Sequence, residues 1–435
     1  MKLRTILLLL PGTLFSGFAG CSSSDSPGGG AVDGGGDAPG PAPVNCTGSA
    51  RYDAWVSDPR LCVSIFATGL GEARQMAFAP NGDLFVNNGR IVALWDADGN
   101  GTSETNEQST FASAPGLNHG LAFSRDGRFV YASSDTTVYR WAYSPGLRQA
   151  NGAAEVVVRG IPGGGSHNSR TLVFDSRGRL YVNVGSAENV DIANTATRAQ
   201  VRRFTIPDTI PSGGIDYASG EVAAHGMRNE VGLYVDAQDR LWGAENGRDN
   251  LTDPDFGGDI HTDNPGEEIN VVDGNGSSFF GYPFCYSEYA LSTGKGPGTE
   301  WADPSLPDAA RKTDAWCADR TNVHPPAFVM PAHWAPLGIV QYTGNSLPFA
   351  GDFIIGVHGS WNRSPAVGRL LARAHVENGS IISVDPIVGQ KDSAGRLTQG
   401  AWDARPVDVR QGPDAAIYFS DDGGGRVFKV GYARP

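Results

Sequence analysis

The chain has 435 residues, with 47 acidic and 34 basic side chains and a formal net charge of −13. This balance argues against a nucleic-acid-binding protein, which needs a basic face for phosphates. Apolar residues make up 40% and charged residues 19%, so most of the chain can bury a core. Its 59 Gly and 28 Pro favour many short strands and turns over long helices.

The first twenty residues are predicted to be a lipoprotein signal peptide rather than part of the fold. Lys2 and Arg4 precede an apolar run at residues 6–10 that is too short to span a membrane. The small residues before Cys21 resemble the bacterial lipoprotein cleavage box, which implies lipid on Cys21. A plain signal peptide ending near a cysteine is the alternative. We therefore expect an exported lipoprotein, anchored at the periplasmic face or in the outer membrane.

Residues 21–44 consist mainly of Ser, Gly, Asp, Pro and Ala, and they are predicted to form a flexible linker. Residues 45–435 are then expected to form the folded domain.

Four cysteines remain beside Cys21, and an even number in an oxidising compartment indicates two disulfides. Three pairings are possible. We favour Cys46–Cys62 and Cys285–Cys317, because each pair closes a local loop. No spacing among the cysteines resembles a zinc site.

One sequence pattern recurs along the chain: an apolar run, a turn with Gly or Asp, and a second apolar run. Its six copies lie at residues 76–86, 121–132, 172–182, 233–243, 339–357 and 407–419. The alternation and turn residues of each copy predict a hairpin. Six such repeats predict an all-β fold, a six-bladed β-propeller with long inserted loops. Residues 62–70 could add a strand that closes the ring against the last blade; a β-sandwich is the less favoured alternative.

Polar and mostly basic residues precede the first strand of several repeats at matching positions. They are Arg74, His119, His167, Arg228, Asn229, His333 with Trp334, and Arg405. Any single histidine among them is expected to satisfy backbone groups between blades. Taken together, they predict an anion-binding site at one mouth of the propeller channel.

Residues 96–107 fit the EF-hand loop pattern, with Asp96, Asp98, Asn100, Gly101 and Glu107 at the expected spacing. The flanking segments are predicted strands rather than helices. The loop is expected either to bind a structural Ca²⁺ or to form a solvated Asp/Gly turn.

Several motifs in this chain resemble the soluble glucose/sorbosone dehydrogenase family, in the same order. They are SHNSR (166–170) with LVFDSRGRLYVNVGS, GMRNEVGLYV (226–235), ENGRDN (245–250), GEEIN (266–270), GYPFCY (281–286), PAHWAPLG (331–338), HGSWNRS (358–364) and RPVDV (405–409). The resemblance covers residues from about 63 to 432 and looks closest to the sorbosone dehydrogenase branch.

The resemblance implies a six-bladed propeller that binds pyrroloquinoline quinone and Ca²⁺. Such an enzyme oxidises a sugar-type alcohol or aldehyde hydrate by hydride transfer and passes electrons to an external quinone or cytochrome. It implies that His167 is the base for the substrate hydroxyl. Arg228 would stabilise charge on the quinone oxygen, Asn229 would hold a nearby cofactor oxygen, and Arg405 would pair with a cofactor carboxylate.

The resemblance also implies that two backbone carbonyls of the motif at residues 246–248, those of Gly247 and Arg248, hold Ca²⁺, and that Asn246 contacts the cofactor. Arg248 stands where the glucose dehydrogenases have Pro. Glu267 and Glu268 could ligate the ion or cap the loop. Two further residues, His333 and Arg363, are predicted to contact the cofactor, and Arg363 stands where some relatives use Lys.

Tyr282, Trp334 and Trp361 are expected either to form aromatic walls for a sugar ring or cofactor or to pack within the propeller. The segment after residues 185–186 lacks cysteines often found in the sorbosone branch, so the resemblance does not imply a particular substrate. A non-catalytic ligand- or protein-binding propeller of the same ancestry is the alternative function. A Ca²⁺-dependent lactone hydrolase is less favoured, because it would need carboxylates converging on the channel, whereas this mouth is basic.

Overall fold

The computed structural model describes residues 51–272 and 278–433. The regular secondary structure in this part of the chain is nearly all strand, with one short helix, α1 (Asp314–Cys317), and the 3-10 turns η1 (Thr105–Glu107), η2 (Tyr217–Ser219) and η3 (Pro254–Phe256). The predicted signal peptide, Cys21 and the linker lie outside the described residues. No helix in the described ranges has the length and apolar character needed to cross a bilayer.

Six sheets form the blades, numbered here in chain order. Blade 1 contains β3 (Met76–Phe78), β4 (Leu84–Asn87), β5 (Ile91–Leu94) and β6 (Gln108–Ala112). Blade 2 contains β7 (Leu117–Phe123), β8 (Phe129–Ser134), β9 (Thr137–Ala142), β10 (Glu155–Arg159) and β14 (Ile215–Asp216). Blade 3 contains β11 (Leu172–Phe174), β12 (Arg179–Val184), β13 (Gln200–Thr205), β15 (Glu221–His225) and β21 (Ser278–Phe279).

The other three blades follow the same scheme. Blade 4 contains β16 (Glu230–Val235), β17 (Leu241–Glu245), β20 (Glu267–Val272) and β24 (Phe328–Met330). Blade 5 contains β25 (Pro336–Gln341), β26 (Phe353–Val357), β27 (Leu370–Glu377), β28 (Ser380–Lys391), β29 (Leu397–Thr398) and, from the start of the described chain, β1 (Trp55–Val56). Blade 6 contains β30 (Pro406–Gln411), β31 (Ile417–Asp421), β32 (Arg426–Tyr432) and β2 (Leu61–Ala67).

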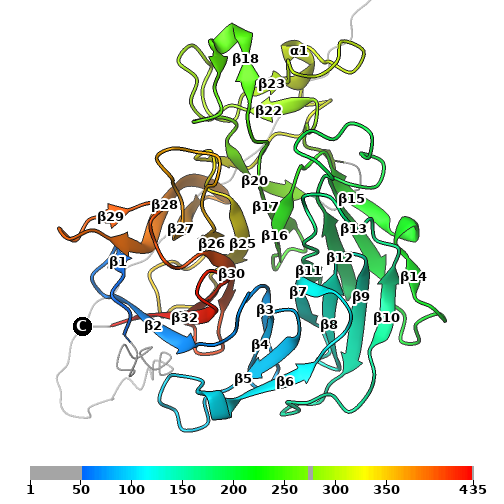
Figure 1. Ribbon diagram of the computed structural model, residues 1–435, viewed down its shortest axis with the longest axis vertical. Coiled ribbons are helices and arrows are strands. Elements are labelled where there is room, and N and C mark those ends of the chain that lie inside the picture. The colour runs from blue at the N-terminus through cyan, green and yellow to red at the C-terminus, as the bar shows by residue number, and fades with distance from the viewer. Residues whose placement is uncertain (1–50, 273–277, 434–435) are drawn as a thin grey trace, which may run out of the picture. The chain divides into compact units, whose positions relative to one another are not determined.

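The first strand of every blade lies innermost, and these six strands surround the channel (Figure 1). Each contacts the first strand of the next blade, and β30 contacts β3 to complete the ring. The predicted six-bladed β-propeller is therefore confirmed. Each predicted repeat corresponds to the first two strands of one blade.

The hairpin turns explain why the repeat can be read from the sequence. Five turn residues of the repeats have positive φ: Gly82, Gly127, Gly178, Asp239 and Ala415. This left-handed conformation suits Gly and is tolerated by Asp, so Gly and Asp mark the turn positions.

An aspartate before the turn adds a second constraint in blades 3 and 4. The Asp175 carboxylate accepts hydrogen bonds from the backbone N–H groups of Arg177 and Arg179. Asp236 does the same for Gln238 and Arg240. These bonds hold the tight turn that joins the two apolar runs of the repeat.

The ring closes as the sequence predicts. Strand β2 pairs antiparallel with β32, with Leu61 opposite Tyr432 and Ile65 opposite Phe428. The first full strand of the propeller thus completes the last blade and removes an exposed sheet edge. Strand β1, which extends blade 5 by pairing with β28, has no counterpart among the predicted strands.

The core lies between neighbouring blades rather than in one central mass. Between blades 5 and 6, Trp402, Phe419 and Phe428 are almost completely buried, and the two Phe rings stack 4.7 Å apart. Burying each such ring contributes about 1.5–3 kcal/mol. Equivalent apolar layers recur around the ring and fix the positions of the loops at its ends.

Two insertions in blade 4 form a lobe beside the ring, seen at the top of Figure 1. The first carries η3 and the short pair β18 (Thr252–Asp253) and β19 (Gly258–Asp259). The second carries α1 and the pair β22 (Cys285–Ser287) and β23 (Glu300–Ala302).

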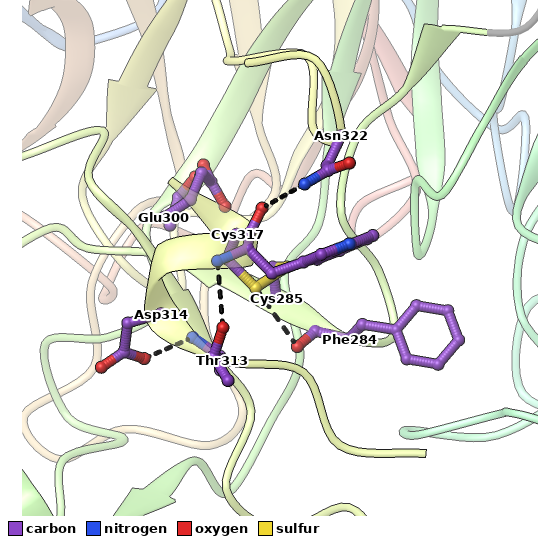
Figure 2. The surroundings of a disulfide bond; sticks show 10 residues. Phe284, Cys285, Glu300, Thr313, Asp314, Cys317 and Asn322 are labelled. Atoms are coloured by element: carbon purple, nitrogen blue, oxygen red, sulfur yellow. Dashed lines mark hydrogen bonds between the residues drawn. A yellow bond between two sulfur atoms is a disulfide. The ribbon is translucent and has the colours of Figure 1, made fainter. Parts of the chain in front are cut away.

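The second insertion contains the disulfide Cys285–Cys317, shown in Figure 2, with a sequence separation of 32 residues. Closing a loop of that length contributes about 3–4 kcal/mol. Cys62 is also disulfide-bonded, and its predicted partner Cys46 lies outside the described residues. The structure therefore confirms the Cys285–Cys317 pairing.

Candidate active site

A cavity of about 500 Å³ opens among the loops at one end of the ring. Its lining includes most of the residues predicted from the sequence: His167, Arg228, Asn229, Asn246, Gly247, His333 and Arg405. They gather there because the start of the first strand and the end of the second strand of an antiparallel hairpin lie at the same edge. The repeat therefore brings residues from blades 3 to 6 to one mouth.

His167 lies in the loop before β11 and is held at one ring nitrogen. Its Nδ1 lies 2.9 Å from the carbonyl oxygen of Ser186, which can only accept, so Nδ1 carries the proton. Nε2 then keeps its lone pair and has no hydrogen-bond partner among the described residues. Burial, and secondly the charge of Arg228, lower the pKa of His167 to about 3. The imidazole is therefore neutral, with an acceptor nitrogen at the cavity.

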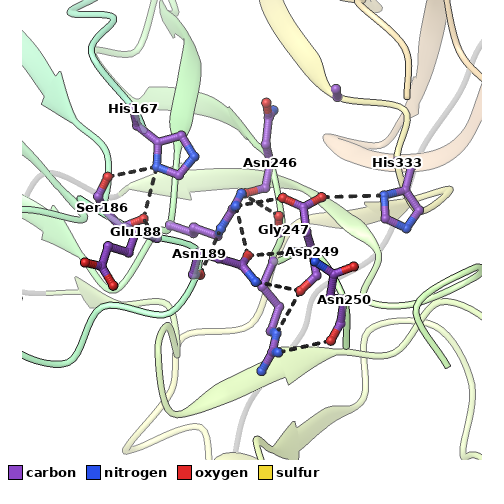
Figure 3. A network of polar contacts seen from close by, with 12 residues as sticks. His167, Ser186, Glu188, Asn189, Asn246, Gly247, Asp249, Asn250 and His333 are labelled. Atoms are coloured by element: carbon purple, nitrogen blue, oxygen red, sulfur yellow. Dashed lines mark hydrogen bonds and ion pairs between the residues drawn. The ribbon is translucent and has the colours of Figure 1, made fainter. Parts of the chain in front are cut away.

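Arg228 precedes β16, and its guanidinium connects its own loop with the loop at Asn189 and with the loop at residues 246–249. It donates to the carbonyl oxygens of Asn246 (3.3 Å) and Gly247 (2.7 Å). It also donates to both oxygens of Asn189 and pairs with the Asp249 carboxylate at 3.0 Å. Figure 3 shows Asn189, Gly247 and Asp249 around this network. These contacts hold Arg228 in place beside the cavity.

His333 lies on the opposite side of the cavity from His167 (Figure 3). Its Nε2 donates to the carbonyl oxygen of His261 at 2.5 Å, and its Nδ1 faces Asp249 at 4.0 Å. Burial is the largest cause of its lowered pKa. His333 thus presents a neutral imidazole edge rather than a cation.

The neighbouring residues Glu267 and Glu268 have different hydrogen-bond partners. The buried Glu267 carboxylate accepts from the backbone N–H groups of Gly247 (2.7 Å) and Ala335 (3.2 Å), and burial raises its pKa to about 7. Glu268 lies below the loop and accepts from the Ser287 hydroxyl at 2.7 Å. Of the two predicted roles, the contacts of Glu267 are those of a residue that caps the Gly247 loop.

Four residues on the blade 5 and blade 6 side are linked by hydrogen bonds and ion pairs, and two of them, Arg405 and His358, line the cavity. Arg405 donates to Nδ1 of His358 at 3.0 Å, and Nε2 of His358 donates to Asp422 at 2.9 Å. The second oxygen of Asp422 pairs with Arg74 at 2.5 Å. Burial lowers the pKa of His358 although Asp422 opposes that shift. This arrangement holds Arg405 at the cavity wall.

Two predicted residues lie outside the cavity lining. The Arg248 guanidinium pairs with Asp303 and donates to Ser305 at 2.8 Å, so its side chain points into the blade 4 insertion. Arg363 donates to the Thr262 carbonyl oxygen and pairs with Asp263, both at 2.7 Å. Their partners lie 55 and about 100 residues away along the chain, so the sequence alone could not reveal them.

The three predicted aromatic residues divide between the cavity and the core. Trp361 lines the cavity and is 75% exposed. Trp334 is buried in the apolar layer between blades 4 and 5. Tyr282 is also buried, and its hydroxyl accepts from the backbone N–H of Asp191 at 2.8 Å. Only Trp361 is placed to contact a bound sugar or cofactor.

His119 behaves as a single propeller histidine is expected to behave. It is buried within β7, contacts Arg74 through Nδ1 and approaches the Thr171 hydroxyl through Nε2. It therefore links neighbouring blades and does not line the cavity.

Sequence reasoning missed Asn189, Asp249 and His358 as lining residues, and Asp422 behind them. A signal was present for two of these. His358 directly follows β26 and Asp422 directly follows β31, just as the predicted Asn246 directly follows β17. Counting positions after the second strand, as well as before the first, would have identified them.

The EF-hand-like loop connects β5 and β6 away from this mouth. Carboxylate oxygens of Asp96, Asp98 and Glu107 lie within 4.8 Å of one another. Asp96 accepts from the N–H groups of Gly99 and Gly101, as in a hydrogen-bonded turn. Binding of Ca²⁺ by this loop stays a prediction.

The cavity residues suit an anionic, acceptor-rich ligand. Two arginines, four asparagines and three histidines line it, together with the carboxylates Asp249 and Glu267, and a volume of about 500 Å³ is typical of a small-molecule site. The buried Nε of Arg405 has no hydrogen-bond partner among the described residues. A ligand carboxylate would satisfy that donor. The Gly247 carbonyl oxygen, with one lone pair used by Arg228, retains a second for a cation.

Comparison with known proteins gives the family. A family profile described as TrAA12-like matches residues 56–433. The chain belongs to the TrAA12-like family. It is 30% identical over 409 residues to a pyrroloquinoline quinone-dependent sugar dehydrogenase of Hypocrea jecorina, a match covering 88% of this chain and 91% of the relative.

A second relative is the pyrroloquinoline quinone-dependent pyranose dehydrogenase of Coprinopsis cinerea, 31% identical over 347 residues. That match covers 75% of this chain and 45% of the relative, so the chain spans about half of that protein's length.

Solved structures share the fold of the TrAA12-like chain. A calcium structure of a Trichoderma reesei enzyme of carbohydrate-active family AA12 has a TM-score of 0.77 at 28% identity, covering 89% of this chain and 99% of the other. The holo form of the Coprinopsis cinerea pyranose dehydrogenase PQQ domain has a TM-score of 0.75 at 27% identity, covering 87% and 97%. The family resemblance inferred from the sequence motifs is thus confirmed; its assignment to the sorbosone branch stays a prediction.

Proposed function

We propose that this protein is a pyrroloquinoline quinone- and Ca²⁺-dependent dehydrogenase that oxidises a sugar or a related alcohol or aldehyde hydrate. The observation that carries the proposal is the neutral His167 with an acceptor nitrogen at a cavity lined by Arg228 and Arg405. The names of the Hypocrea jecorina and Coprinopsis cinerea relatives support the same cofactor and substrate class.

His167 accepts the proton of the substrate hydroxyl at Nε2. The Ser186 carbonyl oxygen fixes the ring with its proton on Nδ1, so the acceptor faces the substrate. A pKa near 3 in the free protein makes the imidazole unprotonated at neutral pH but a weak base. A carboxylate-bearing ligand beside it would raise that pKa and strengthen the base.

The cofactor would be held by the residues that converge on the cavity. Arg405 offers its unpartnered Nε to a carboxylate, and Asn229 and Asn246 offer amide groups. The carbonyl oxygen of Gly247, with that of Arg248 after it, would supply ligands to Ca²⁺. Arg228 supplies positive charge where negative charge develops during oxidation. When bound, the cofactor with Ca²⁺ accepts the hydride of the substrate carbon.

The finer substrate assignment, an aldose or a sorbosone-type sugar, also belongs to this proposal. Trp361 at the rim is the exposed aromatic surface available to a sugar ring. Electrons then pass to an external acceptor, a quinone or a cytochrome.

The proposed function includes export and anchoring by lipid on Cys21. The charged start, the short apolar run and the FAGC sequence support it. Changing Cys21→Ser should move the protein from the membrane fraction to the soluble fraction. A protein that stays in the membrane fraction after this change would contradict lipidation.

The direct test of the activity is reconstitution. Purified protein is given pyrroloquinoline quinone and Ca²⁺, the spectrum of bound quinone is recorded, and a panel of aldoses is oxidised with an artificial electron acceptor. We expect a bound-quinone spectrum and oxidation that is lost on adding a chelator. Absence of quinone binding would favour the non-catalytic ligand- or protein-binding propeller.

A further inference from the structure

A second cavity, of about 470 Å³, lies where blade 3 meets the blade 4 insertions. Aromatic rings form one wall: Phe279 lies 5.0 Å from His225 and 6.2 Å from Phe284, between ring centroids. The Tyr282 ring adds to this lining. A cavity of this size with aromatic walls suits a flat molecule of one or two rings.

The polar groups of this second cavity favour a ligand that accepts hydrogen bonds. No Asp or Glu is among the described residues that line it, whereas Arg198, His225 and Gln200 are. The carboxamide nitrogen of Gln200 is buried and has no hydrogen-bond partner in the described part of the chain. The terminal torsion of a glutamine is soft, so a small rotation would present this donor to a ligand. A flat ring bearing acceptor oxygens and no positive charge fits these groups.

Thin partitions separate this cavity from the candidate active site. Arg198, in the second cavity, donates to the Gly185 carbonyl oxygen at 3.4 Å, and the Gly185 backbone packs against His167 so closely that a Cβ there would lie 2.7 Å from it. A second partition runs through Asn189, whose carbonyl oxygen lies 3.2 Å from both the Tyr282 hydroxyl and Arg228 Nε.

The backbone also shows that the two cavities lie close together. Gly226 lines the second cavity and Arg228 lines the first. Two residues of extended chain span at most about 7 Å. A molecule in the second cavity is therefore a near neighbour of one in the active site.

We propose that the second cavity binds the electron acceptor, a small quinone of the naphthoquinone type. This inference rests on the proposed function. The net exchange balances: the C–H and O–H bonds at the oxidised sugar carbon break and a C=O bond forms. The two electrons and two hydrogens reach the quinone, whose two carbonyl oxygens become the hydroxyls of a hydroquinone. The aromatic side chains of the cavity wall pack against the flat quinone ring, and the Gln200 side-chain amide donates to one of the quinone carbonyl oxygens.

The first test measures binding of 1,4-naphthoquinone-2-sulfonate to the protein without added cofactor, by calorimetry. Ala196→Trp places an indole on an exposed residue of the cavity lining, and Gln200→Leu removes the unpartnered amide. We expect Kd to rise at least tenfold in Ala196→Trp and about 3–10-fold in Gln200→Leu. Ala394→Trp, on an exposed turn of blade 5, is the matched control and should leave Kd unchanged.

The second test uses the reconstituted enzyme. The KM for the naphthoquinone should rise in Ala196→Trp and Gln200→Leu. The KM for sugar, and turnover with ferricyanide, which lacks a flat apolar ring, should not change. A quinone that fails to bind, or binds all variants equally, would overturn the inference even if sugar is oxidised. If binding responds to both variants but no sugar is oxidised, the site stands as a quinone site and the proposed function fails.

Discussion

The two sides of the candidate active site are built differently. On the blade 3 side, His167 is held by Ser186 alone and keeps one ring nitrogen without a partner among the described residues. On the blade 5 and 6 side, Arg405, His358, Asp422 and Arg74 form a continuous chain of hydrogen bonds and ion pairs. The first arrangement leaves an atom available for a proton, and the second holds positive charge in a fixed place.

From this difference we infer that the blade 3 side carries out the proton transfer and that the blade 5 and 6 side binds the cofactor. A base must be free to change its protonation state, so it has few partners. A group that anchors a carboxylate works best when its position is set before the ligand arrives. Substitutions on the two sides should therefore affect different measured quantities.

Changing His167→Ala should lower kcat about 10²–10⁴-fold, because a general base is lost. Steady-state sugar oxidation with an artificial acceptor measures this effect. His375→Ala, on the outer part of blade 5, is the control and should retain normal turnover. If His167→Ala keeps near-native turnover, His167 is not the base.

Arg228→Ala should affect both catalysis and cofactor binding, because Arg228 is proposed to take part in both. We expect kcat to fall about 10²–10³-fold through loss of charge stabilisation. Cofactor affinity should also weaken, because the guanidinium holds the Asn246 and Gly247 carbonyls in place. Turnover and cofactor titration are measured on the same preparation, and an effect on only one of them would contradict this dual role.

Arg405→Ala should weaken cofactor binding about 10–100-fold, the value of a charge-assisted pair, with a smaller effect on kcat at saturating cofactor. Arg405→Lys should restore part of the affinity, since it keeps the charge but not the forked geometry. Titration of both variants with pyrroloquinoline quinone checks this. Equal affinity in wild type and Arg405→Ala would exclude the proposed anchor.

Asp422→Asn tests the chain behind Arg405 and should have a more modest effect. It removes the charge that holds both His358 and Arg74. We expect cofactor Kd to rise about fivefold, for about 1 kcal/mol of lost positioning, with kcat unchanged at saturation. A fall in kcat with unchanged Kd would contradict a positioning role.

The His167 imidazole should not become protonated near pH 6.5, where an ordinary histidine titrates. Burial lowers its pKa to about 3, from a usual value near 6.5. Protonation on acidification therefore occurs first in the unfolded chain, so His167 reduces folded stability only below about pH 6.5. In the cofactor-free protein, its NMR signal should stay that of the neutral ring from pH 8 to 5; a midpoint near 6.5 would refute this environment.

The propeller could be predicted because its repeat is local. Each hairpin is encoded by two apolar runs and a turn residue, as in Gly127 or Asp239, and these need no information from distant segments. Strand β2 could also be placed, because a ring of six hairpins leaves the last blade to be completed by the start of the domain. Strand β1 could not, because two residues carry no periodicity.

The repeat made part of the site predictable, and the resemblance added Asn246 and Gly247, which also line the cavity. His167, Arg228 and Arg405 stand at fixed points of the hairpin phase, and the structure brings them to one cavity. Arg363 was placed at the cofactor by resemblance, but its side chain pairs with Asp263 outside the cavity lining. The prediction for Arg248 concerned its backbone carbonyl, and its side chain pairs with Asp303. These pairings depend on the blade 4 insertions, which follow no repeat and leave no trace in the local sequence.

One titration tests most directly whether His167 acts in catalysis and Arg405 in cofactor binding. Wild type, His167→Ala and Arg405→Ala, each with Ca²⁺, are titrated with pyrroloquinoline quinone, and the absorbance of the bound quinone gives Kd. We predict the same Kd for wild type and His167→Ala and a Kd about 10–100-fold higher for Arg405→Ala. Loss of binding in His167→Ala with normal binding in Arg405→Ala would contradict the account.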